Sequence, residues 1–303
     1  MKQEQRIERY REAVAVLPVR LRKAALALPD EQQGRAEELH LRAGQPLSVL
    51  LPEGECPLEI AVEPGDLETL CDIATEFSRY AAVETLREGY LSVKGGFRIG
   101  LCGTAVMKDG INTNLRQLSS ATVRIAREQL GVAEDVVQQL FRNGEFCSTL
   151  ILSPPGAGKT TLLRDLIRML SAGSAPYAPQ RVSLIDERGE VAMMHRGQPQ
   201  MDVGPYTDVL DACPKALGIP MVLRAMNPQI IAVDEITAYQ DIRAMALAAG
   251  CGVRLLATIH AADVAELMDK PLYRTLLEER IFRLAVSITR REAGRRYRVE
   301  ELP

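Results

Sequence analysis

The sequence contains no tryptophan, and aromatic residues make up only 4% of it. Surfaces that bind single-stranded nucleic acid depend on aromatic rings that stack on the bases. The net charge of −3 provides no overall positive field that would attract a nucleic-acid backbone. We therefore do not expect a nucleic-acid partner.

Close cysteine pairs and long apolar runs are also missing. The six cysteines are scattered, with no pair at the spacing of a metal knuckle or redox motif, and they predict free thiols in a reducing compartment. The first residues are charged, and no apolar run approaches about 18 residues. We expect neither an export signal nor a membrane span, and we expect the protein in the cytoplasm.

The chain of 303 residues, 47% hydrophobic and 25% charged, has the composition of a globular protein and a length that suits two domains. Residues 1–143 mix short helices and strands, including a hairpin predicted around residues 94–96. Residues 144–303 alternate apolar strands with helices, which is typical of a parallel sheet buried on both faces. We predict an α/β domain preceded by a smaller α+β domain, with the boundary at Asn143-Gly144. The predicted strands of the second domain are 149–152, 182–185, 230–233 and 253–259.

The most informative motif is Ser153-Pro-Pro-Gly-Ala-Gly-Lys-Thr160, which follows an apolar strand and opens an amphipathic helix. In this setting the backbone N–H groups of the loop point at an anion, as in a phosphate-binding Walker A loop. Ser153 stands where the usual pattern has its first glycine. Lys159 is predicted to reach the β and γ phosphates of a nucleotide, and the Thr160 hydroxyl is predicted to ligate Mg²⁺. The predicted nucleotide-binding residues are Pro155, Gly156, Ala157, Gly158, Lys159, Thr160 and Thr161.

Two carboxylates follow the apolar run Ile230-Ile-Ala-Val233, as in a Walker B strand. At the carboxyl end of a parallel strand they face the ligand-binding edge of the sheet. Asp234 is predicted to hold Mg²⁺ through its water shell, and Glu235 to polarise the attacking water. Glu187 and Glu190, which follow the neighbouring strand, are rival candidates for the general base, and the sequence does not decide between Glu187 and Glu235.

His260 ends the fourth predicted strand, at the same edge of the sheet. A polar residue at this position lies near the γ phosphate in such an architecture, so His260 is a candidate sensor of hydrolysis. The other two histidines, His40 and His195, have no comparable context. An arginine that stabilises the transferred phosphoryl group is expected, and the sequence does not single one out.

Taken together, these motifs resemble the stage III sporulation protein AA family of endospore-forming bacteria, whose P-loop also has serine in place of the first glycine. The resemblance covers most of the chain. Its segments are 42–47, 87–103, 153–165, 186–190, 207–215 and 224–236.

The resemblance implies a RecA-like P-loop ATPase similar to the hexameric motors of type II and type IV secretion, with ATP and Mg²⁺ as cofactors. In that comparison residues 186–190 match the Asp box, and His260 occupies the place of the His box. It further implies a homo-oligomer, expected to be a hexamer. This oligomer would act on the mother-cell side of the membrane and dock on membrane-embedded channel subunits.

Two other functions remain open at this point. The arginines between residues 290 and 298 favour a nucleic-acid-stimulated RecA-like ATPase or helicase, against the scarcity of aromatic residues. A scaffold that binds ATP with little turnover fits the same loop. Nucleic-acid stimulation and nucleotide-dependent assembly are the observations that separate these functions from a motor.

Overall fold

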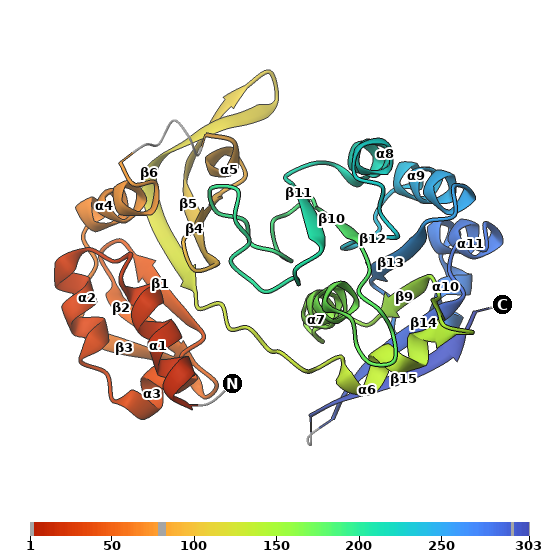
Figure 1. Ribbon diagram of the computed structural model, residues 1–303. Helices are drawn as coiled ribbons and strands as arrows, with labels where there is room; N and C mark the ends of the chain where they lie inside the picture. Colours follow the sequence, from red (N-terminus) through yellow and green to blue (C-terminus); the bar gives the residue numbers. More distant parts are fainter. Residues whose placement is uncertain (1–2, 78–82, 292–293, 303) are drawn as a thin grey trace. The chain divides into compact units, whose positions relative to one another are not determined.

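The computed structural model describes residues 3–77, 83–291 and 294–302 (Figure 1). Its contacts divide the chain into two compact units. Unit 1 comprises Met1–Glu128 together with Met193–Gln200, and unit 2 comprises Gln129–Ala192 together with Met201–Pro303. Of the helices in the described ranges, none combines the length and the apolar character that a membrane span requires.

Unit 1 is built on an antiparallel sheet of six strands in the order β3-β2-β1-β6-β5-β4. Buried and partly exposed residues alternate along β1 and β4, so one face of each strand contributes to the core. The strands are β1 (Glu38–Arg42), β2 (Pro46–Leu51), β3 (Gly54–Ala61), β4 (Tyr90–Val93), β5 (Phe97–Lys108) and β6 (Ile111–Arg124). The helices are α1 (Gln3–Val14), α2 (Val19–Leu26), α3 (Asp30–Arg35), α4 (Pro64–Ala74) and α5 (Val83–Arg87).

The hairpin predicted around residues 94–96 is present as β4 and β5. The sequence predicts a strand over residues 121–126, whereas strand β6 begins ten residues earlier, at Ile111. The early part of β6 is exposed or partly exposed along its length, so it lacks the burial pattern that identifies a strand in a sequence.

A segment from the second half of the chain completes unit 1. Residues 193–200 leave the loop after β10 and pack with unit 1. The Gly95 N–H donates a hydrogen bond to Gln200 Oε1 at 2.7 Å, and Arg196 forms an ion pair with Glu76. These residues lie in the stretch 194–208, which is rich in turn-forming residues.

Unit 2 contains a seven-stranded sheet in the order β11-β10-β12-β13-β9-β14-β15. All neighbouring pairs are parallel except β14 and β15, which form a terminal antiparallel hairpin. The parallel sheet predicted from the apolar runs is therefore confirmed. Its strands are β9 (Thr149–Leu152), β10 (Val182–Asp186), β11 (Thr207–Asp211), β12 (Ile230–Val233), β13 (Arg254–Ile259), β14 (Leu284–Arg291) and β15 (Gly294–Glu301).

Helices cover both faces of this sheet. Figure 1 shows α7 (Lys159–Ala172) on one side, and α8 (Lys215–Ala225) and α9 (Tyr239–Gly250) on the other. Leu162, Leu166 and Ile167 of α7 are fully buried, as its helical spacing predicts. The remaining helices of unit 2 are α6 (Glu134–Val137), the 3-10 helix η2 (Gln138–Leu140), α10 (Val264–Asp269) and α11 (Pro271–Glu278).

Two local predictions in unit 2 differ from the structure. The sequence predicts one helix over residues 133–142. The helical turns end by Leu140, because the short hairpin β7 (Phe141–Arg142) and β8 (Glu145–Phe146) begins at Phe141. Asn143 and Gly144 form its turn, both with positive φ. Strand β11 was not predicted, since it lies at the edge of the sheet and none of its residues is buried.

Candidate functional site

The loop between β9 and α7, which is predicted to bind phosphate, contains two glycines with positive φ. Gly156 and Gly158 have φ angles of 74° and 103°, which side chains of L residues rarely adopt. Gly158 is also the N-cap of α7, so the first N–H groups of the helix have no carbonyl partner within it. Ser153 is buried, and its hydroxyl donates to the carbonyl oxygen of Pro154 at 3.0 Å.

Lys159, the first residue of α7, folds back over this loop. Only 7% of the residue is exposed. Its Nζ donates to the carbonyl oxygens of Ser153 at 2.9 Å and Pro154 at 3.2 Å. Burial lowers the pKa of Lys159, and the negative charges of Asp234 and Glu235 oppose that shift. The ammonium group is thus desolvated beside the loop that would receive an anion.

One hydrogen-bonded group joins Thr160 at the start of α7, Asp234 just after β12 and Thr258 near the end of β13. Thr160 Oγ1 donates to Asp234 Oδ2 at 3.0 Å, and Thr258 Oγ1 donates to Asp234 Oδ1 at 2.5 Å. Thr258 also accepts a hydrogen bond from the Glu235 N–H at 2.8 Å. Sequence reasoning did not assign Thr258 a role, and its only signal is a hydroxyl among the apolar residues of a buried strand.

Glu235 and His260 extend this group. Glu235 has a φ of 50°, a left-handed conformation at the end of the Walker B strand. Its Oε1 lies 3.2 Å from His260 Nε2, and its Oε2 accepts from Arg188 Nη1 at 2.8 Å. His260 Nδ1 lies 2.8 Å from Lys159 Nζ. The imidazole therefore lies between the loop lysine and the Glu235 carboxylate.

The rival base, Glu187, has a different environment. It forms an ion pair with Lys215, the first residue of α8, which is 5% exposed. Lys215 ends the segment 207–215 that carries part of the family resemblance, but sequence reasoning gave it no role, because its contact with Glu187 depends on the packing of α8. The carboxylate of Glu187 thus already has a cationic partner.

Asp186, one position earlier, has a structural role in the turn. Its carboxylate accepts hydrogen bonds from the N–H groups of Glu190, Val191 and Ala192, at 3.2 Å or less. Burial raises its pKa, and those backbone hydrogen bonds oppose the shift. Desolvation of the carboxyl group and, more weakly, the charge of Asp186 raise the pKa of Asp211 to about 6.

The structure brings most of the predicted site residues together. Lys159, Thr160, Asp234, Glu235 and His260 belong to one connected network, whereas Glu187 belongs to a separate pair at the end of β10. In the loop Pro155 and Gly156 are exposed, Ala157 is buried, and Thr161 is half-buried at the start of α7.

The donor set fits Mg²⁺ together with a nucleotide. Proteins usually hold Mg²⁺ with one or two carboxylates, while phosphates and waters complete its octahedral shell. Asp234 supplies a carboxylate and Thr160 supplies a hydroxyl oxygen beside the loop. Among the described residues, no group of three or more His, Cys, Asp or Glu side chains could hold a metal by itself.

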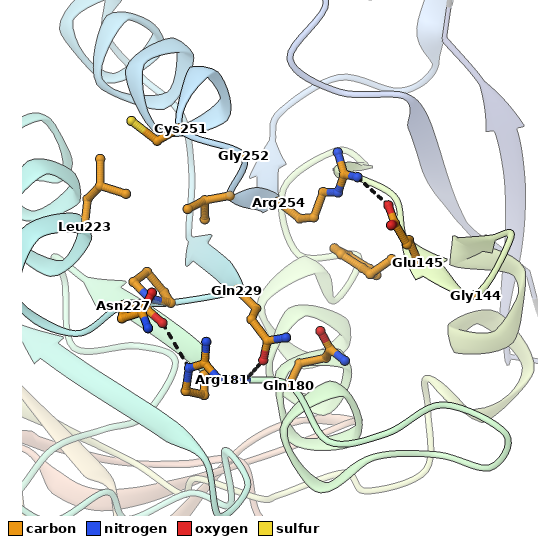
Figure 2. Close-up of a pocket in the computed structure, with 13 residues that line it drawn as sticks. Gly144, Glu145, Gln180, Arg181, Leu223, Asn227, Gln229, Cys251, Gly252 and Arg254 are labelled. Atoms are coloured by element: carbon orange, nitrogen blue, oxygen red, sulfur yellow. Dashed lines mark hydrogen bonds and ion pairs between the residues drawn. The ribbon is translucent and has the colours of Figure 1, made fainter.

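A cavity of about 690 Å³ lies at the other end of the strands. Figure 2 shows that it is lined by Arg181, Gln229 and Arg254, which stand next to or at the starts of β10, β12 and β13. Arg254 forms an ion pair with Glu145 at 2.7 Å, and Arg181 donates to the Asn227 carbonyl at 3.0 Å. Because open parallel sheets bind ligands at the carboxyl ends of their strands, this cavity is not part of the candidate site.

Comparison with known proteins identifies a family and a relative that match most of the chain. The family described as sporulation stage III, protein AA, matches residues 7–299. Stage III sporulation protein AA of Bacillus subtilis (strain 168) is 36% identical over 279 residues, which cover 92% of this chain and 91% of the relative.

Solved structures show the fold. The ATPase DotB of Legionella pneumophila has a TM-score of 0.55 at 15% identity, covering 88% of this chain and 76% of its own. The pilus retraction motor PilT with bound ADP has a TM-score of 0.57 at 16% identity, covering 88% and 79%. The fold is that of a RecA-like P-loop ATPase domain with a smaller α+β domain. From the match to residues 7–299 and the Bacillus subtilis relative, the chain belongs to the family of sporulation stage III protein AA.

Proposed function

We propose that this protein is a Mg²⁺-dependent ATPase that drives or assembles a membrane-embedded channel or secretion complex during sporulation. The observation that carries the proposal is the connected network of Lys159, Thr160, Asp234, Glu235 and His260. This network joins the phosphate-binding loop to a carboxylate that can orient water. The family and the fold of its neighbours support the same assignment.

Each residue of the network has a role that follows from its chemistry. The glycine backbone of the loop and Lys159 would bind the phosphates. Thr160 would hold the metal through its hydroxyl, and Asp234 would hold it through the water shell of the ion. Bound Mg²⁺ supplies charge neutralisation at the β and γ phosphates. Both rival glutamates have a cationic partner, Arg188 for Glu235 and Lys215 for Glu187. We assign the general base to Glu235, because its carboxylate contacts His260 and through it the loop lysine. His260 contacts both Lys159 and Glu235, so it senses the change when the γ phosphate leaves.

The rest of the proposal concerns assembly. We assign ATP hydrolysis to residues 144–303, and oligomer and partner binding to residues 1–143. The working form is a homo-oligomer, expected to be a hexamer, at the cytoplasmic face of the membrane on the mother-cell side. It would be attached there through channel subunits. An arginine from a neighbouring subunit would complete the charge stabilisation of the transition state.

The central test is ATP turnover by the purified full chain with Mg²⁺, compared with Lys159→Ala and Asp234→Asn. Both variants should lose turnover, while circular dichroism and thermal unfolding show an intact fold. Lys23→Ala, an exposed lysine on α2, is the matched control and should keep wild-type turnover. Undiminished hydrolysis by Lys159→Ala would refute the assignment.

Two additional measurements separate the alternatives. Salt-sensitive stimulation of turnover by DNA or RNA would favour a nucleic-acid-dependent ATPase. Size measurements with and without ATP would identify a scaffold, if nucleotide changes the oligomer while turnover stays near the buffer rate. A motor predicts turnover that rises when the cytosolic segment of its membrane partner is added.

A further inference from the structure

The side chain of Arg295 lies against the P-loop of the same chain. A Cβ atom placed on Gly158 would lie 2.6 Å from Arg295 Cζ and 2.8 Å from Arg295 Nη2. The guanidinium group therefore occupies the space that the missing side chain of Gly158 leaves open. Arg295 is near the start of β15, far from the loop in sequence.

The sheet explains how this arginine reaches the loop. Strand β14 runs parallel to β9, and its Ser287 pairs with Leu152, where β9 ends and the loop begins. The β14–β15 hairpin continues beyond that level, and Arg295 pairs with Arg290, three residues past Ser287. At about 3.3 Å per residue, this places Arg295 roughly 10 Å beyond the end of β9, at the height of the P-loop.

The partners of Arg295 leave its charge uncompensated. Its Nη1 donates to Gln129 Oε1 at 2.9 Å, and it forms a hydrogen bond with the Tyr297 side chain. Both partners are neutral amide or hydroxyl groups. Arg295 forms no ion pair with another described residue, and it is exposed. An exposed guanidinium held by neutral groups remains available to an anion.

The position beside Gly158 is where a phosphate would come. Glycines in phosphate-binding loops allow the ligand to approach the backbone closely, because no Cβ stands in the way. The same side of Gly158 faces the guanidinium of Arg295. A guanidinium presents parallel N–H groups that match two phosphate oxygens, and such charge-assisted pairs are stronger than neutral hydrogen bonds.

We propose that Arg295 is a phosphate-binding residue for nucleoside di- and triphosphates, supplied by the C-terminal hairpin of the same chain. In the nucleotide-free protein its side chain covers Gly158, and it turns to the phosphate chain when nucleotide enters the loop. This inference rests on the proposed function, since it requires nucleotide in the P-loop. It adds a cationic group from outside the loop to the one that Lys159 provides.

The test is the affinity of the full chain for a fluorescent ADP analogue, measured for the wild type and for Arg295→Ala, Arg295→Gln, Arg296→Ala and Lys159→Ala. Arg295→Ala and Arg295→Gln should weaken binding by at least about tenfold. The glutamine variant keeps a hydrogen-bonding group toward Gln129 and Tyr297, so it separates loss of charge from loss of support. Arg296 is the matched control: it is exposed and adjacent on β15, and its side chain points to the opposite face of the strand. It should stay within about twofold of wild type.

Each outcome bears on a different claim. If Arg295→Gln binds within about twofold of wild type while Lys159→Ala does not bind, Arg295 has no phosphate role and the proposed function stands. If Lys159→Ala binds the ADP analogue as tightly as wild type, the proposed function fails, and the role of Arg295 that rests on it fails as well. An equal loss of ADP affinity in Arg296→Ala would show that the effect comes from the overall positive charge of the hairpin. That result would also overturn the proposal.

Discussion

Lys159 Nζ lies 2.8 Å from His260 Nδ1, and the opposite ring nitrogen of His260 lies 3.2 Å from Glu235 Oε1. An ammonium group can only donate, so Nδ1 must accept. The proton of a neutral imidazole is then on Nε2, where it can donate to the Glu235 carboxylate. One ring thus orients the lysine that would bind phosphate and the carboxylate that would position water.

Removing this ring should affect turnover more than binding. We expect His260→Ala to lower the ATP turnover rate by at least about tenfold, or 1.4 kcal/mol in activation free energy. Its ADP affinity should remain near that of wild type, because Lys159 keeps the loop carbonyls as partners. Steady-state ATPase rates and fluorescent ADP binding provide the two readouts. His195→Ala, a histidine of unit 1, is the control, and equal losses in both variants would contradict a specific role for His260.

Glutamine substitutions at the two rival glutamates should separate the base from the ion pair. Glu235→Gln should lower turnover by about 10²- to 10⁴-fold with little change in thermal stability, because the amide cannot accept a proton from water. Glu187→Gln should mainly destabilise the fold, by about 1 to 2 kcal/mol, because buried Lys215 loses its carboxylate partner. Turnover and urea unfolding should be measured on both variants. The reverse pattern would assign the base to Glu187.

The raised pKa of Asp211 makes the stability of the folded protein depend on pH. Asp211 is exposed at the edge of the sheet, yet desolvation of its carboxyl group and, more weakly, the charge of Asp186 raise its pKa from 3.8 in the unfolded chain to about 6 in the folded protein. The folded state therefore binds more protons between these values, and the contribution of Asp211 to stability falls as the pH rises from about 4 to 6.

Asp211→Asn removes the carboxyl group, whose ionisation above about pH 6 lowers the stability of the folded protein. At pH 7.5 the variant should be more stable than wild type, by about 1 kcal/mol once the exposure of the residue is taken into account. The difference should shrink as the pH approaches 4.5. Urea unfolding at both pH values measures it, with Asp208→Asn on the same strand as the control. A difference that is constant across pH would show that the Asp211 charge is not its cause.

Gly218 should not tolerate a methyl group. It lies in α8, and a Cβ there would be 2.9 Å from Ile185 Cγ2 and 3.1 Å from Leu210 Cδ2. Gly218→Ala should therefore destabilise the protein by about 1 to 3 kcal/mol through overpacking of the helix against β10. Gly250→Ala is the matched control at the end of α9, where a Cβ meets nothing within 4 Å. It should be neutral or stabilising by about 0.5 kcal/mol, and thermal unfolding of both variants makes the comparison.

The features predictable from sequence are those with a local pattern. Strands β9 and β12 are continuous apolar runs, and they were predicted with the bounds that the structure has. The convergence of Lys159, Asp234 and His260 followed from a general property of parallel sheets, whose carboxyl ends share one edge.

The features that escaped prediction depend on how distant segments meet. Thr258 and Lys215 gain their roles only from the register of β13 with β12 and from the packing of α8 beside β10. Arg295 reaches Gly158 because β14 pairs with β9. No residue pattern within the hairpin predicts that pairing. Strand β11 has no buried residue, so hydrophobic periodicity could not identify it.

The discontinuity of unit 1 has a consequence for the order of folding during synthesis. Residues 193–200 belong to unit 1, yet the ribosome makes them after the P-loop and β10. The N-terminal sheet can form earlier, but the contacts of Gly95 with Gln200 and of Glu76 with Arg196 must wait for that segment to emerge. A fragment cut after Glu128 would omit this piece of unit 1, and adding residues 193–200 as a separate peptide would be the way to restore it.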